Sequence, residues 1–178
     1  DATIGMPAHE GPLRVLKSMH PEGAATCHQV IVHPPGGIVG GDVLRIDIDV
    51  GEGAHAVLTT PGASRFCRSA GREALQTVRA TLHAGSRLEW LPLETIVHTG
   101  ARAGNQAVFR LGEGASMIGW DITCLGLPAA GEGFGAGHLV QHLEIERRWL
   151  ERGRIDAADD RLLRSPIGLA GHPVVGTA

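Results

Sequence analysis

The feature that most constrains the fold is a glycine turn that recurs three times with a strand on either side. Its copies read VGEGAHA (50–56), LHAGSRL (82–88) and LGEGASM (111–117). The shared glycines, Gly53, Gly85 and Gly114, are 32 and 29 residues apart. A period near 30 residues is typical of layered or solenoid-like β structure. Chance recurrence of G-x-G turns in a glycine-rich β protein explains the same pattern, so both interpretations stay open.

Strands are indicated most clearly at 43–50, VLRIDIDV, where apolar and charged residues alternate with a period of two. A second strand follows the first turn, and Val78, Ala80 and Leu82 share one face before the next turn. Helices are expected to be few. We interpret 61–69 as opening with a short helical turn and 156–172 as a capped helical turn broken at Pro166. The segment 138–153 fits both periods.

Composition agrees with many short strands and excludes several classes of function. The 178 residues suit one domain, and 26 glycines and 10 prolines favour strands joined by turns. A net charge of −3 and 3% aromatic residues argue against a nucleic-acid partner. No apolar run approaches the roughly 18 residues of a membrane span. Three widely spaced cysteines indicate reduced thiols in a cytoplasmic protein.

The stretch HPPGGIVGGD (33–42) raises the question of a ligand site. A phosphate loop needs a cation, but Asp42 stands in its place and a strand follows instead of a helix. A tight metal site would have only His33 and Asp42 as ligands, and the ten histidines form no H-E-x-x-H motif. We therefore interpret the glycines as residues that shape the loop and let the backbone pass close to neighbouring strands; they are Gly36, Gly37, Gly40 and Gly41.

Four carboxylates lie in otherwise apolar or glycine-rich surroundings: Asp42, Glu94, Asp121 and Glu132. Acidic side chains are seldom buried without partners. Each one alone is explained by a turn or a cap, but the four together favour a functional role. General acid and base catalysis by a glycosidase-type pair is one such role, although no substrate-binding aromatic residues accompany them.

Six stretches span nearly the whole chain in a fixed order. They are HPPGGIVGGD (33–42), LTTPGASRF with the following RS (58–69), LEWLPLETI (88–96), GARA (100–103), IGWDITCLGLPAAGE (118–132) and SPIGLAGHPVVGT (165–177). In this order and spacing they resemble the urease accessory protein family UreD, called UreH in some bacteria. Each motif alone is weak, but six in register are specific.

The resemblance implies a fold and a role that is not enzymatic. The family fold is all-β, a β-helix-like arrangement of two layers built from many short strands with one or two short helices. Residues 1–178 would form a single UreD-type domain that lacks an N-terminal strand and a C-terminal portion. UreD proteins are scaffolds that act with UreF and the GTPase UreG on apo-urease and help to install nickel in its active site. No permanently bound cofactor is expected, only nickel(II) in transit, and neither a nucleic acid nor a membrane as partner.

The family also has a water-filled tunnel, and the resemblance carries that role to particular residues. The transient nickel path would use Asp42, Glu94, Asp121 and Glu132, and the hydroxyl lining would be Thr59, Thr60 and Ser64. Isolated carboxylates and hydroxyls suit transit because thiolates and clustered imidazoles would trap nickel. Two alternatives remain. One is a carboxylate-dependent hydrolase that uses Asp42 and Asp121, and the other is a metal-free structural β-solenoid that binds a protein partner.

Overall fold

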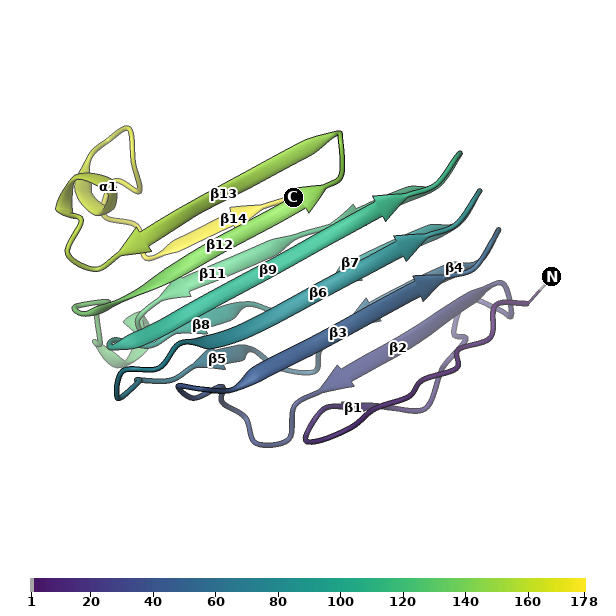
Figure 1. Ribbon diagram of the computed structural model, residues 1–178, viewed down its shortest axis with the longest axis horizontal. Helices are drawn as coiled ribbons and strands as arrows, with labels where there is room; N and C mark the ends of the chain where they lie inside the picture. The colour runs from purple at the N-terminus through teal and green to yellow at the C-terminus, as the bar shows by residue number, and fades with distance from the viewer. Residues whose placement is uncertain (1) are drawn as a thin grey trace.

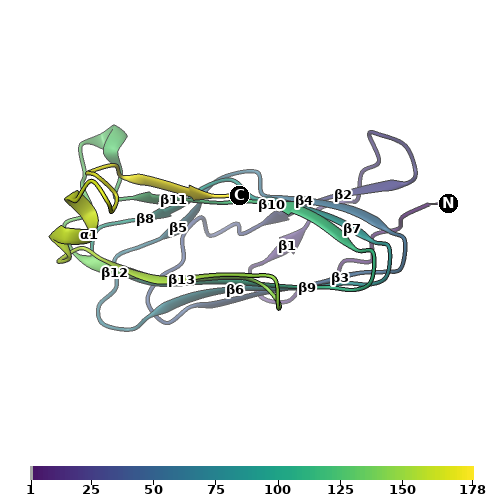
Figure 2. The same cartoon turned by 90° about the horizontal axis from the view of Figure 1, so that it is seen from above.

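The computed structural model describes residues 2–178 as a flattened β-solenoid with two facing layers of strands (Figures 1 and 2). The elements are β1 (Arg14–Val15), β2 (Thr26–Val32), β3 (Val43–Val50), β4 (His55–Thr59), β5 (Ser64–Phe66), β6 (Ala74–Leu82), β7 (Arg87–Leu91), β8 (Thr95–Val97), β9 (Ala101–Leu111), β10 (Ser116–Gly119), β11 (Asp121–Leu125), a 3₁₀ turn (Pro128–Ala130), β12 (Gly137–Ile145), β13 (Trp149–Asp156), α1 (Asp160–Arg164) and β14 (Val174–Thr177). The all-β, two-layer prediction is confirmed.

Each coil of the solenoid contributes one strand to each of three sheets. The coils are β4-β5-β6, β7-β8-β9 and β10-β11-β12, and strands of successive coils pair in parallel. One layer is the sheet β13-β12-β9-β6-β3, and the other combines β1-β2-β4-β7-β10 with β14-β11-β8-β5. Parallel neighbours need a long crossover, which here is the remainder of the coil.

The recurring glycine turn marks the same corner of successive coils. Gly53, Gly85 and Gly114 have φ of +64°, +64° and +66°, the left-handed conformation that glycine adopts without steric cost. The turns stack, because the amide of Gly53 donates to Ala84 O and that of Gly85 to Glu113 O. The period near 30 residues is therefore the length of one coil, and chance recurrence is excluded.

Inward-facing side chains form two apolar clusters along the solenoid. The larger one contains Ile31, Val50, Leu58, Val78, Ala80, Leu82, Leu88, Trp90, Ala107, Phe109, Ala115 and Leu143. The smaller one contains Ile38, Leu44, Phe66, Ala74, Val97, Ala101, Ala103, Leu125 and Leu139. Leu13, in the segment before β1, packs against both clusters. Figure 1 shows β1 beside β2 at the end of the stack of coils. The N-terminal segment thus contributes to the core at that end of the solenoid.

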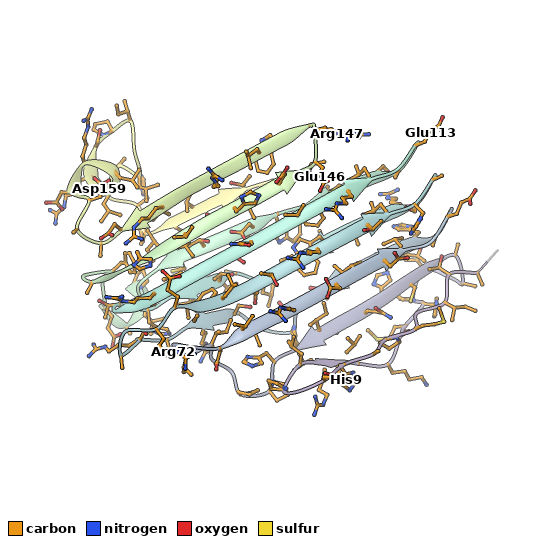
Figure 3. The ribbon with its side chains drawn as sticks, viewed as in Figure 1. His9, Arg72, Glu113, Glu146, Arg147 and Asp159 are labelled. Carbon is orange, nitrogen blue, oxygen red and sulfur yellow. The ribbon has the colours of Figure 1, made fainter. Side chains whose placement is uncertain are left out.

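Alternation predicted β3 correctly, since Leu44 and Val50 are buried whereas Arg45, Asp47 and Asp49 are exposed. The ambiguous segment 138–153 is the antiparallel hairpin of β12 and β13, whose turn carries Glu146 and Arg147 (Figure 3).

Two helical expectations had different outcomes. The expected helical turn in 156–172 is α1, which is capped by Asp159 and ends before Pro166. The expectation for 61–69 was wrong, because Ser64–Phe66 is β5 and pairs with β8. Phe66 is fully buried there, and this burial, set by the coil, outweighed the local turn signal.

Candidate functional site

A band of polar side chains separates the two apolar clusters. Along β6, β9 and β12, Gln76, Asn105 and Gln141 each stand two residues from a member of the smaller cluster and two from a member of the larger one. They are direct neighbours in the sheet register. Ser64, Thr95 and Thr123 form the matching row on β5, β8 and β11. We call these six residues, with Thr60 and Asp121, the polar tract.

Asp121 is the acidic member of the tract and joins the two layers. Its Oδ2 accepts a 2.8 Å hydrogen bond from Asn105 Nδ2, and its Oδ1 accepts from Gln141 Nε2 at 2.7 Å and Thr123 Oγ1 at 3.2 Å. Gln76 Nε2 donates to Asn105 Oδ1 at 3.4 Å and extends the chain of amides. Asn105 and Gln141 are 3% and 8% exposed, so both oxygens of Asp121 are held by interior donors.

Burial raises the pKa of Asp121 above the 3.8 of an exposed aspartate. The hydrogen bonds from Asn105, Thr123 and Gln141 act in the opposite direction, and the nearby charge of Glu151 adds to the increase. Desolvation is the largest cause, so the net direction is upward. By contrast, the charged residues Arg72, Glu113 and Arg147, which Figure 3 labels, lie at exposed turns.

Two adjoining cavities lie along the tract. The first, of about 300 Å³, is lined by apolar side chains and by Thr60, Ser64, Gln76, Thr95, Asn105 and Asp121. The second, of about 270 Å³, extends to His33 and Gly36. Both cavities are lined by Ile46, Thr60, Ser64 and Gln76. Polar side chains therefore line two neighbouring cavities between the 33–42 loop and Asp121.

The structure brings together three of the predicted site residues. Thr60, Ser64 and Asp121 line the first cavity. Thr59 is not among the lining residues of either cavity, and its hydroxyl donates to Leu91 O at 2.6 Å on the neighbouring strand. Adjacent strand residues face opposite sides, which places Thr60 inward and Thr59 outward.

Asp42 closes the loop between β2 and β3. Its Oδ2 accepts from the Val39 amide at 2.9 Å, and it lines neither cavity. Within the loop, a Cβ on Gly40 would lie 2.9 Å from Arg72 O, and Gly41 has φ of +104°. Ile38, earlier in the same loop, makes a parallel bridge to Phe66, so the loop supplies the middle position of an incomplete first coil.

Glu94 and Glu132 also lie outside the cavity linings. Glu94 is half-buried beside β8, and its charge, second to desolvation, raises the pKa of Cys124. Glu132 is exposed, and its backbone pairs with Leu127 after the 3₁₀ turn. Among residues 2–178, no three His, Cys, Asp or Glu side chains are gathered closely enough to hold a metal ion. The role of these two carboxylates and Asp42 in nickel transit stays a prediction.

The tract contains five residues that sequence reasoning missed: Gln76, Thr95, Asn105, Thr123 and Gln141. A signal for the amides was present. Each interrupts an inward row of apolar residues, as Asn105 does between Ala103 and Ala107. Because a buried amide without a partner costs about 1–3 kcal/mol, three in register indicate a polar interior.

No helix among residues 2–178 has the length and apolarity that crossing a membrane requires.

Comparison with known proteins places the chain in a family. A family model described as UreD urease accessory protein matches residues 3–178. The chain is 57% identical over 177 residues to the urease accessory protein UreD of Leptothrix cholodnii, covering 99% of this chain and 64% of that protein. It is 60% identical over 164 residues to the UreD protein of Albidiferax ferrireducens, covering 92% and 59%.

The chain spans about three fifths of the length of the curated relatives that it matches. Their names describe accessory proteins, in agreement with the prediction that the chain is not an enzyme. The match over nearly all of the chain and the two-layer solenoid lead to the same assignment: the chain belongs to the UreD family of urease accessory proteins.

Proposed function

We propose that this chain is part of a urease maturation factor that guides nickel(II) along its polar tract towards the apo-urease active site. The observation that carries the proposal is Asp121, a carboxylate placed between two apolar clusters and next to a cavity. An interior carboxylate costs stability, so its presence is better explained by a use than by packing.

The ligands of the tract suit an ion that must move on. Its described side chains offer one carboxylate, amides and hydroxyls, all oxygen donors, whereas nickel binds most tightly to nitrogen and sulfur donors. Six waters occupy roughly 200 Å³, so a hydrated divalent ion fits a cavity of about 300 Å³. Weak binding at successive positions allows an ion both to enter and to leave.

The role of the assembled protein follows from the same proposal. The full-length protein would act in the cytoplasm as a scaffold with UreF and the GTPase UreG, and the complex would dock on apo-urease. Nickel is the cargo in this account, and no cofactor is held permanently.

A path through the tract is tested by substituting residues that line the cavities and leaving Asp121 unchanged. In the full-length protein, Ser64→Leu places a larger side chain at a position that lines both cavities, and Thr60→Val removes a lining hydroxyl. Thr81→Val is the matched control, since Thr81 lies on β6 between buried Ala80 and Leu82 and so faces outward. We expect urease activity in cells to fall with Ser64→Leu and Thr60→Val and to stay normal with Thr81→Val. Normal activity with all three variants would contradict the proposal.

Nothing in the geometry favours the hydrolase alternative, because Asp42 and Asp121 do not line a common cavity. The same substitutions at Ser64 and Thr60 distinguish our proposal from the alternative of a metal-free interaction module. It predicts that narrowing the interior leaves activation unchanged as long as the protein folds and binds its partners.

A further inference from the structure

Gln76 is the amide that lines both cavities of the polar tract. It lies on β6 between the inward-facing residues Ala74 and Val78, and it is one of four residues that the two cavities share. Its Nε2 donates to Asn105 Oδ1 at 3.4 Å. Asn105 uses its Nδ2 for Asp121 Oδ2 at 2.8 Å, so its oxygen is the atom that faces Gln76. The two hydrogen bonds therefore set the direction of both amides.

This direction leaves the oxygen of the Gln76 amide as an open acceptor. Within residues 2–178 no group donates a hydrogen bond to Gln76 Oε1. Ser64 on β5 and Thr95 on β8 are direct neighbours in the sheet register, and both line the first cavity. Among the described residues, only His28 Nε2 is buried without a partner, so the three oxygens of Gln76, Ser64 and Thr95 are not sealed from the cavities.

Three open oxygen acceptors suit the water shell of a cation. Waters bound to a metal ion donate hydrogen bonds, which hydroxyl and amide oxygens accept, whereas an amide NH₂ group only donates. The second cavity has no carboxylate among its lining residues, so a cation inside it depends on neutral acceptors. Arg65 also lines that cavity, but it is exposed, and its neighbours Ser64 and Phe66 on β5 face inward.

We propose that Gln76 Oε1, oriented by Asn105, and the hydroxyls of Ser64 and Thr95 form a hydration site for nickel(II) between the two cavities. This inference rests on the proposed function, because it names how the same ion passes from one cavity to the other. The ion keeps its waters, and no bond to nickel forms or breaks at this site. Neutral acceptors hold a divalent ion weakly, which lets it move on to the Asp121 carboxylate.

Substitutions of similar size test the hydration site in the full-length protein. Gln76→Met removes the amide, and Thr95→Val removes a hydroxyl that Thr95→Ser keeps. Gln106→Met is the matched control, because Gln106 is exposed on the outer face of the neighbouring strand β9. Each protein is titrated calorimetrically with nickel(II) alone and with cobalt(III) hexaammine, whose ammine ligands donate hydrogen bonds but do not exchange. Urea denaturation measures the stability of each variant.

We expect Gln76→Met and Thr95→Val to lower the affinity for both probes about twofold to tenfold, the usual contribution of one hydrogen bond. Thr95→Ser and Gln106→Met should bind as the wild type does. A merely structural role would lower the denaturation midpoint and leave the affinity of the folded protein unchanged. Wild-type affinity for both probes in folded Gln76→Met and Thr95→Val would overturn the hydration site. A loss confined to nickel(II) would show that the ion does not keep its waters there.

The proposed function fails separately. If Asp121→Ala leaves urease fully loaded with nickel, the tract is not a nickel path, whatever the affinities of the Gln76 and Thr95 variants. If Asp121→Ala leaves urease without nickel while those variants bind both probes as the wild type does, the path stands and the hydration site alone is wrong.

Discussion

Gln141 on β12 donates a 2.7 Å hydrogen bond to Asp121 on β11, across the space between the two layers of the solenoid. Asn105 makes the second such bridge, at 2.8 Å. Together they tie a carboxylate to the opposite sheet along a line where the core is polar. This arrangement has consequences for stability as well as for transport.

Stability should depend on pH through Asp121. Its folded-state pKa lies above its unfolded value, so the folded state binds more protons between the two. The stabilisation of the folded state by protonated Asp121 is fully present below the unfolded pKa, near 4. It is lost as pH rises through the folded pKa. Asp121→Asn cannot titrate. We expect its unfolding free energy, measured by urea denaturation, to change less with pH from 4 upward than that of the wild type, and equal slopes would contradict this.

Glu151 should influence Asp121 in a measurable direction. Its negative charge raises the pKa of Asp121, so Glu151→Gln should lower that pKa. Glu113→Gln is the control, because Glu113 lies at the turn after β9 (Figure 3). A carboxyl titration of both variants checks the prediction, and an unchanged Asp121 pKa in Glu151→Gln would show that the two charges do not interact.

Asp42 can be tested as a turn residue and as a nickel ligand separately. Asp42→Ala loses the acceptor for the Val39 amide and should cost about 1 kcal/mol of stability. Asp42→Asn keeps an oxygen acceptor but loses the charge, so we expect near wild-type stability in chemical denaturation. If Asp42 also belongs to the nickel path, Asp42→Asn lowers the nickel content of urease. A wild-type nickel content with Asp42→Asn would remove Asp42 from the path.

The stacked turns give a test of the solenoid itself. Replacing Gly53, Gly85 or Gly114 by Ala places a side chain at φ near +65° and should cost about 1–2 kcal/mol each. Asn tolerates this conformation better and should cost less. Gly51→Ala is the control, because Gly51 has no left-handed φ and no atom within 4 Å of an added Cβ. Equal denaturation midpoints for Gly53→Ala and Gly51→Ala would contradict the turn geometry.

Much of the fold was predictable from local pattern, but the site was predictable only in part. The alternation in 43–50 and the spacing of Gly53, Gly85 and Gly114 depend on strand geometry and on one coil length, and both are visible in the sequence. Asp121 stood out as a charge among apolar residues. Asn105 and Gln141 interrupt rows of apolar residues, but their shared contact with Asp121 arises only when β9 and β12 pair and the layers face each other.

The misplaced residues have a related explanation. Thr59 and Thr60 are adjacent, so one side chain faces outward and the other inward. Leu58 lies in the core, which makes Thr59 the outward-facing residue and Thr60 the inward-facing one. The helical turn expected at 61–69 reflected local residue preference, whereas pairing of β5 with β8 decided the conformation. Composition and spacing do not contain these non-local contacts.

The most direct test of the account is the nickel content of urease purified from cells whose full-length accessory protein carries Asp121→Ala. Asp47→Ala is the matched control, an exposed carboxylate on the outer face of β3. With both variants present at wild-type levels, we expect Asp121→Ala to leave urease largely without nickel and Asp47→Ala to leave it fully loaded. Full nickel content in the Asp121→Ala cells would contradict a nickel path through the polar tract.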